Sequence, residues 1–263
     1  MAFSTLNYRV EDGVALITLD RVAAHNAVNS VMSRELPLAW QRFDSDDSAI
    51  VAIVTGAGER AFCVGADLAD QPQMDGEGRD GTLASMRWTS LQNRVWKPVI
   101  CAVNGMTVGG GLHFVADSDI VLAAEHATFF DTHVKVGLVA GLEPVCLARR
   151  MPLEAVLRMT LVGGGERIPA ARALALGLVG ELVPAADLLR RALEIAAMIK
   201  TNSPAAMARS KRTIWEAADR GLGAALENAW HSIMEHNTHP DVEEGARAFL
   251  DKRAPCWRPY SER

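Results

Sequence analysis

Residues 103–119 read VNGMTVGGGLHFVADSD, and they join an apolar segment to a helical one through three consecutive glycines. The preceding residues 98–103 are mostly apolar and predict a buried strand. Because glycine has no Cβ, residues 109–111 allow the backbone to approach a ligand closely. The first N–H groups of the following helix lack internal partners, and the helix dipole adds partial positive charge there. The stretch therefore indicates either a site that stabilises an anion or a tight turn with close packing.

A second glycine turn lies earlier in the chain, where the apolar segment 50–54 leads towards Gly-Ala-Asp-Leu at residues 65–68. Together the two turns resemble those of the crotonase superfamily, the enoyl-CoA hydratases and isomerases. In that family each turn supplies one backbone N–H, and the two N–H groups hold the thioester oxygen of an acyl-CoA as it becomes an enolate. The resemblance implies that the donors here are Ala66 and Gly110. The resemblance also assigns four neighbouring residues to substrate or CoA binding: Gly65, Asp67, Leu68 and Gly109.

The order of the expected strands and helices fits the same resemblance. Apolar strand-like runs mark the first half of the chain, and apolar residues recur at helical spacing beyond Pro144. The resemblance implies an α/β fold, the crotonase-like ββα spiral, with a C-terminal helical oligomerisation module. We expect the spiral core over residues 1–200 and the helical module over residues 201–263. In the family such helices build a homotrimer, and two trimers often stack as a dimer of trimers.

Local signals predict individual elements of this fold. An Asp-Gly pair between two strand-like runs predicts a hairpin over residues 7–19. Asn29 suits the N-cap of a helix that begins at Ser30. Apolar spacing predicts a helix over residues 83–96. The polar stretch before it, residues 69–82, reads as a loop, and in the family this region shapes the acyl pocket.

A loop for CoA is implied at residues 20–29, DRVAAHNAVN, where the family usually has L-N-R-P-x-x-x-N-A-L. In the family this loop touches the adenine and pantetheine of CoA. Arg21, Asn26 and Ala27 match the pattern and are assigned to CoA binding by the resemblance. Valine replaces the proline, and alanine and histidine replace the basic residues common before the asparagine, so some phosphate contact is expected to be weaker.

A further CoA contact is implied near the C-terminus. Residues 248–253 read AFLDKR and resemble the A-F-x-E-K-R segment of family hydratases. There the phenylalanine and the lysine reach the CoA bound in a neighbouring subunit, which implies this role for Phe249 and Lys252. Without the resemblance, Lys252 reads as a solvated residue of a terminal helix.

The main departure from the family concerns its two catalytic glutamates. One lies three residues beyond the central glycine of G-G-G, which is His113 here, and the other ends an F-G-x-P-E segment, which is His133 here. An imidazole titrates near neutrality, at about 6.5, so one neutral and one protonated histidine are candidates for base and acid. Their titrations would be coupled, which predicts activity in a narrow window around neutral pH. Either residue also fits a hydrogen-bonded core histidine.

Other acidic groups near these positions leave alternatives open. Family dienoyl-CoA isomerases and dehalogenases carry an aspartate beyond the second site, and the nearest carboxylate in that region here is Glu143. Asp131 is placed to orient His133 or to face solvent. The superfamily's β-diketone hydrolases use a histidine at the His133 position, paired with an aspartate that would fall at Leu142.

Composition limits the class and compartment of the protein. The chain has 263 residues and a formal charge of −5, which argues against general nucleic-acid binding. No apolar run approaches the roughly 18–20 residues of a membrane span, and the N-terminus does not resemble a signal peptide. The four cysteines show no C-x-x-C spacing, which is typical of free thiols in a cytoplasmic protein.

These observations lead to one principal hypothesis and two alternatives. The chain is expected to be an acyl-CoA enzyme of the enoyl-CoA hydratase/isomerase type, whose oxyanion hole is formed by Ala66 and Gly110, with His113 and His133 as acid and base candidates. The histidines leave open whether the reaction is hydration, double-bond isomerisation or another enolate chemistry. No bound cofactor and no metal are expected, since CoA enters as part of the substrate and two histidines lack a third ligand of suitable spacing. The alternatives are a non-catalytic acyl-CoA-binding protein and a β-diketone C–C hydrolase.

Overall fold

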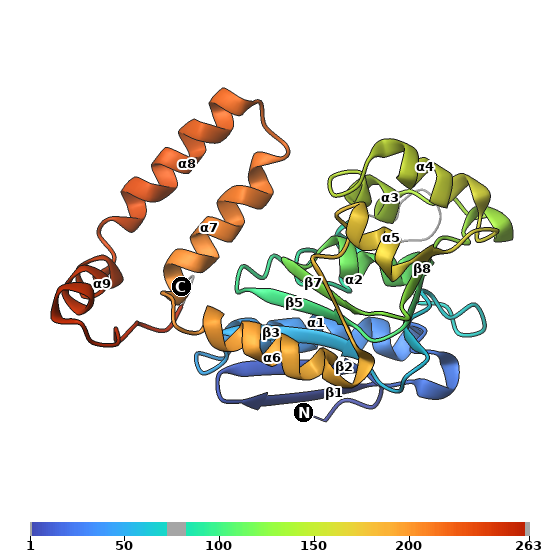
Figure 1. Cartoon of the computed structure of the whole chain (residues 1–263), viewed down its shortest axis with the longest axis horizontal. Helices are drawn as coiled ribbons and strands as arrows, with labels where there is room; N and C mark the ends of the chain where they lie inside the picture. The colour runs from blue at the N-terminus through green and yellow to red at the C-terminus, as the bar shows by residue number, and fades with distance from the viewer. Residues whose placement is uncertain (1, 73–82, 261–263) are drawn as a thin grey trace.

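The computed structural model describes residues 2–72 and 83–260 and contains two β-sheets with helices around them (Figure 1). The first sheet has six strands in the order β1-β2-β3-β5-β7-β10, and the second has four in the order β4-β6-β8-β9. The strands are β1 (Leu6–Glu11), β2 (Val14–Leu19), β3 (Val51–Gly56), β4 (Ala61–Cys63), β5 (Val99–Val103), β6 (Met106–Val108), β7 (Ile120–Ala124), β8 (Thr128–Phe130), β9 (Ile168–Pro169) and β10 (Glu181–Val183). The helices are α1 (Ser30–Ser45), α2 (Leu112–Ala116), α3 (Leu142–Leu147), α4 (Leu153–Val162), α5 (Ala170–Ala175), α6 (Leu188–Ile199), α7 (Pro204–Ala217), α8 (Leu222–His236) and α9 (Pro240–Asp251).

The first sheet is buried on both faces, which explains the apolar runs of its central strands. Ala52 and Val54 of β3 pack into one apolar cluster with the buried side of α1. Val51 and Ile53 point the opposite way and pack into a second cluster with α6, which lies across the sheet in Figure 1. β1 and β2 form the expected antiparallel hairpin, and the other neighbouring strands of this sheet pair in parallel.

The second sheet brings three loops to one edge. Each of β3, β5 and β7 is followed closely by a short strand of the second sheet, namely β4, β6 and β8. β4 pairs with β6 and β6 with β8, both in parallel. Because parallel strands end at the same edge, the turns that begin after Cys63, Val108 and Phe130 emerge side by side. This strand order is the α/β spiral that the resemblance implies.

Two helix starts agree with the sequence signals. The side chain of Asn29 caps α1 by accepting a hydrogen bond from the Met32 N–H at 2.9 Å. Ser203 caps α7 in the same way through the Ala206 N–H, and Pro204 occupies the first turn. Both caps satisfy N–H groups that have no partner inside their helix.

The expected helix over residues 83–96 is wrong. Only a 3₁₀ turn forms at Leu83–Ser85, and hydrogen-bonded turns follow. The side-chain oxygen of Gln92 accepts the backbone N–H groups of Trp88 and Thr89 at 2.8 and 3.2 Å. Such side-chain bonds compete with helical ones, so the apolar spacing misleads here. Of the loop expected over residues 69–82, residues 73–82 lie outside the described residues.

The C-terminal helices are joined to the core through α7. Lys211 of α7 is buried, and its ammonium lies 2.9 Å from the carboxylate of Asp119. Beyond α7, the helices α8 and α9 stand away from the sheets (Figure 1). No residue of α8, all of which the structure describes, is buried, so apolar side chains such as Trp230 are exposed. The module boundary and the trimer stay predictions. Over the described ranges, no helix combines the length and the apolar character that a membrane crossing would need.

Candidate active site

The two glycine turns touch each other backbone to backbone. They leave the same edge of the second sheet, because β4 and β6 are parallel and each ends shortly before its turn. Gly65 has a φ of +84°, a conformation that favours glycine, and a Cβ there would lie 2.8 Å from the Gly110 nitrogen. A side chain at Gly65 would therefore push the turns apart, and glycine keeps them together.

The N–H of Ala66 lies outside the pairing that holds its turn. The Val28 N–H donates to the Gly65 carbonyl at 2.8 Å, and the Asp67 N–H donates to the Val28 carbonyl at 2.9 Å. In a parallel bridge of this kind, the intervening residue directs its own N–H away from the partner strand. Within the described ranges, no backbone hydrogen bond outside the regular elements uses the N–H of Ala66 or Gly110. Both N–H groups are therefore candidate donors to an anionic oxygen.

Arg21, Asn26 and Ala27 lie beside the first turn and brace it. The buried Asn26 accepts a hydrogen bond from the Arg21 N–H at 3.0 Å. The Arg21 guanidinium donates to the Ala27 carbonyl at 2.6 Å and to the Asp67 carboxylate at 2.9 Å. The structure thus brings Arg21, Asn26 and Ala27 to the first turn. The neighbouring Leu68 side chain is 61% exposed. Their contact with CoA stays a prediction.

Phe249 and Lys252 are not brought to this site within one chain. Phe249 is 84% exposed on α9, and Lys252 is exposed immediately after that helix. Figure 1 shows α9 on the opposite side of the molecule from α3 and α4. The expected contact concerns CoA in a neighbouring subunit, so the position within a single chain leaves that prediction open.

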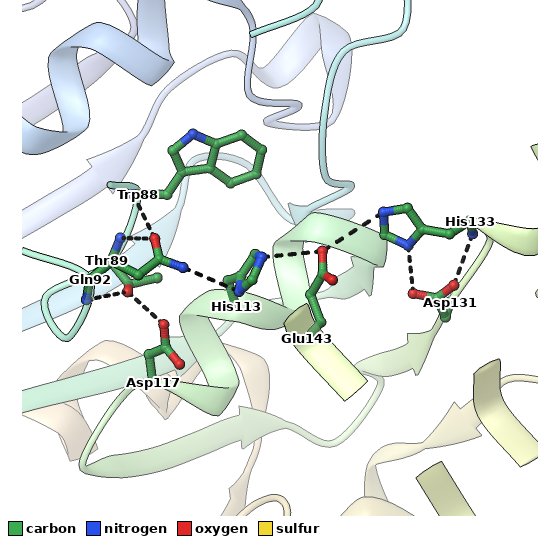
Figure 2. Close-up of polar contacts among 8 residues, drawn as sticks. All are labelled: Trp88, Thr89, Gln92, His113, Asp117, Asp131, His133 and Glu143. Carbon is green, nitrogen blue, oxygen red and sulfur yellow. Dashed lines mark hydrogen bonds and ion pairs between the residues drawn. The ribbon is translucent and has the colours of Figure 1, made fainter. Parts of the chain in front are cut away.

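His113 lies in α2, directly behind the second turn, and is 1% exposed. Its ring meets the Trp88 ring edge to face, with centroids 6.2 Å apart. Its Nδ1 lies 3.3 Å from the side-chain nitrogen of Gln92, as Figure 2 shows. The Gln92 NH₂ group can only donate a hydrogen bond, so Nδ1 is the acceptor and the neutral ring carries its proton on Nε2.

Glu143, near the start of α3, lies between the two histidines (Figure 2). Its Oε1 is 3.3 Å from Nε2 of His113 and 3.8 Å from Nε2 of His133. The 3.3 Å between His113 Nε2 and the carboxylate is slightly longer than an ordinary N–H···O hydrogen bond, so the contact is chiefly electrostatic. Burial alone would raise the pKa of Glu143, but its contacts with the histidines, His113 foremost, outweigh burial and lower that pKa.

His133 follows β8 and is held by the fully buried Asp131. The Asp131 carboxylate accepts the backbone N–H and the ring Nδ1–H of His133, both at 2.8 Å. The side-chain hydrogen bond to Asp131 raises the pKa of His133, although burial opposes the shift. The His133 side chain is 21% exposed, and a Cβ on Gly109 would lie 3.3 Å from its Cε1. His133 therefore lies against the second turn, with Nε2 on the side of Glu143.

The assembled groups can perform acid–base chemistry beside an oxyanion site. The lowered pKa of Glu143 keeps its carboxylate ionised, as a base must be, and the raised pKa of His133 favours the protonated form that an acid needs. From the sequence, Glu143 is noted only as the carboxylate nearest to an expected aspartate. Its position as the single charged residue after the apolar residues 138–142 is a signal that could have marked it as a site residue. The sequence does not predict Gln92 as a site residue, because the apolar spacing of residues 83–96 is that of a helix. Among the described residues, no three acidic, histidine or cysteine side chains are grouped to hold a metal ion.

Comparison with known proteins places the whole chain among acyl-CoA enzymes. A family model described as enoyl-CoA hydratase/isomerase matches residues 9–259. The chain is 35% identical over 255 residues to mevalonyl-coenzyme A hydratase of Aspergillus fumigatus, which covers 94% of this chain and 92% of that protein. It is 33% identical over 257 residues to (E)-benzylidenesuccinyl-CoA hydratase of Thauera aromatica, which covers 95% and 97%. The crystal structure of an enoyl-CoA hydratase/isomerase from Mycobacterium paratuberculosis superposes with a TM-score of 0.90 at 38% identity, over 98% of this chain and all (100%) of that one.

Proposed function

The chain belongs to the enoyl-CoA hydratase/isomerase family, and on that premise we propose that it adds water across the conjugated double bond of an enoyl-CoA thioester, or removes it in reverse. The observation that carries this proposal is the position of Glu143 between His113 and His133, next to the two glycine turns. Relatives named hydratases support water as the co-substrate.

In the proposed reaction, the ionised Glu143 takes a proton from water while the water oxygen bonds to Cβ of the acyl group. The electrons of the double bond move onto the thioester oxygen, which receives hydrogen bonds from the N–H groups of Ala66 and Gly110. The His133 imidazolium then delivers its Nε2 proton to Cα, and the thioester carbonyl reforms. A proton passing from Glu143 to His133, whose facing atoms lie 3.8 Å apart, restores the starting state.

This assignment replaces the pair of histidines by a carboxylate and one histidine. Nδ1 of His113 is occupied by Gln92, and its Nε2 faces Glu143, so neither nitrogen is open to substrate. His133 keeps Nε2 on the open side of the site. Because the base is a carboxylate with a lowered pKa and the acid an imidazole with a raised pKa, we expect a broad pH plateau rather than a narrow optimum.

The first experiment follows loss of the conjugated enoyl thioester by its ultraviolet absorbance. Short-chain and medium-chain enoyl-CoA and the acyl groups named in the relatives form the substrate panel. Gly65→Ala puts a Cβ 2.8 Å from the Gly110 nitrogen, so we expect kcat/KM to fall by about 10²–10³-fold. Gly223→Ala is the matched control, because a Cβ there meets nothing within 4 Å. Equal turnover in both variants would contradict the proposed oxyanion site.

A binding protein without activity would give a different pattern. In that case acyl-CoA would bind to the intact protein, but no substrate of the panel would change at any pH. Failure to bind any acyl-CoA would also overturn the proposed function.

The Asp131–His133 pair favours a second candidate, a C–C hydrolase acting on a β-diketone. A carboxylate that orients an imidazole is suited to activating water, and the aspartate missing at Leu142 is here supplied from position 131. Such an enzyme does not require CoA. Competition with free CoA separates the two: it should inhibit a hydratase and leave cleavage of a β-diketone unchanged.

A further inference from the structure

A chain of polar side chains continues beyond His113, on the side opposite Glu143 and His133 (Figure 2). From Glu143 it runs through His113 to Gln92, then to Thr89 and Asp117. We propose that Gln92 is a positioning residue that fixes the tautomer of His113 and thereby keeps Glu143 ready to accept a proton. This inference deepens the proposed function and rests on the role of Glu143 as the base.

The orientation of the Gln92 amide is fixed by the backbone. Its Oε1 accepts the N–H groups of Trp88 and Thr89 at 2.8 and 3.2 Å. Rotating the amide by half a turn would place NH₂ against these two N–H donors and leave both without an acceptor. The NH₂ group is therefore committed to Nδ1 of His113, 3.3 Å away.

The turn that carries Gln92 is fastened to the helix of His113. The Thr89 hydroxyl accepts a hydrogen bond from the backbone N–H of Gln92 at 3.3 Å and donates one to the Asp117 carboxylate at 2.6 Å. Asp117 caps the end of α2 and is 2% exposed. Gln92 and His113 are thus held relative to each other through a buried hydrogen bond, which limits the freedom of the amide to withdraw.

The tautomer of His113 determines whether the Glu143 carboxylate faces an N–H bond or a nitrogen lone pair. With the proton on Nε2, the ring presents the positive end of an N–H bond to the carboxylate 3.3 Å away. With the proton on Nδ1, it would present a lone pair, and the carboxylate would be stabilised only in its protonated form. The other titratable groups near Glu143 and His113 are His133, Cys146 and Asp117. Of these, His133 brings a positive charge towards Glu143, but His113 has the larger effect on the pKa of that carboxyl.

The first test needs no substrate. Histidine-selective ¹⁵N labelling of the intact protein distinguishes protonated from unprotonated ring nitrogens, and the His113 signals are assigned by their loss in His113→Asn. We expect an unprotonated Nδ1 and a protonated Nε2 at neutral pH. The opposite tautomer in the intact protein would overturn the inference.

The second test uses paired variants of Gln92. In Gln92→Leu, Nδ1 loses its donor and both tautomers become available, so we expect the acid limb of kcat/KM to move to higher pH, with roughly a threefold to tenfold loss on that limb. In Gln92→Glu, one oxygen can keep the two backbone N–H groups while the other accepts Nδ1–H of a doubly protonated, cationic His113 ring. Nε2–H of that cation still faces Glu143, so the acid limb of this variant should not move to higher pH.

The control is Gln41→Leu, the same substitution at an exposed position on α1, which should leave the profile unchanged. A purely structural role for Gln92 would lower activity without moving the acid limb, or would affect both Gln92 variants alike, and either result would overturn the inference. An intact protein that shows the expected tautomer but turns over no enoyl thioester would instead contradict the proposed function.

Discussion

His113 and His133 stand at the two positions where related hydratases are expected to carry glutamates, yet their surroundings differ. His113 sits in a short helix, is 1% exposed, and receives a hydrogen bond from the neutral amide of Gln92. The His133 side chain follows a strand, is 21% exposed, and donates to the buried carboxylate of Asp131. An amide and a carboxylate on the far side of the ring therefore distinguish two otherwise identical residues.

The comparison indicates that the hydrogen-bond partner of each imidazole determines which ring nitrogen carries the proton and which group the ring can serve. A donor behind Nδ1 directs the remaining proton of His113 towards Glu143 and leaves no lone pair open. A carboxylate behind Nδ1 raises the pKa of His133, which favours the protonated form that the proposed acid requires. Glu143 is shared by both rings, and it restores a carboxylate to a site in which the sequence shows none at the family positions.

The largest effect is expected from removing that shared carboxylate. Glu143→Gln keeps the shape but cannot accept a proton, so kcat/KM should fall by about 10²–10⁴-fold. The change is measured with the enoyl thioester assay across pH. Glu154→Gln, an exposed glutamate on α4, is the matched control. A loss below about threefold would return the role of base to one of the histidines.

The next effect separates the two histidines by stability. His113→Ala leaves a buried cavity and removes partners from Gln92 and Glu143, so the free energy of unfolding should fall by about 2–4 kcal/mol. His133→Asn shortens a partly exposed ring and keeps an N–H donor for the buried Asp131 carboxylate, so we expect a loss nearer 1 kcal/mol. Denaturant unfolding of both variants at one protein concentration gives the comparison. Equal losses would show that the contrast in burial carries no energetic weight.

The smallest effect concerns the alkaline side of the pH profile. The pKa of His133 is raised chiefly by its hydrogen bond to Asp131, and the proposed acid is active only below that pKa. Activity should therefore be lost as pH rises through it. Asp131→Asn removes the charge, so the pKa should return towards about 6.5 and the alkaline limb should move to lower pH.

For Asp131→Asn we expect roughly a tenfold loss near pH 8 and little change near pH 6, where the imidazole is protonated in either case. The pH dependence of kcat/KM measures the shift. Asp47→Asn, at an exposed aspartate beyond α1, serves as the control. An alkaline limb that stays in place would mean that His133 is not the titrating acid.

Much of the fold follows from local signals. The hairpin over β1 and β2, the cap at Asn29 and the buried strand at β5 are predicted from short stretches and confirmed. The α/β fold and the family expected from the two glycine turns are confirmed as well. The helix expected over residues 83–96 is wrong, because Gln92 binds backbone N–H groups that a helix would use.

By itself, the sequence determined individual strands, a helix cap and the two glycine turns, because apolar periodicity and turn chemistry depend on neighbouring residues. The class of fold followed from the resemblance that those turns carry. The sequence also showed that histidine stands at both glutamate positions. Only the tertiary structure decided that Glu143 lies between these rings, that Asp131 faces His133 and that Gln92 faces His113. These contacts join separate elements, and side-chain protonation depends on burial and on charges within a few ångströms, which the linear order of residues does not specify.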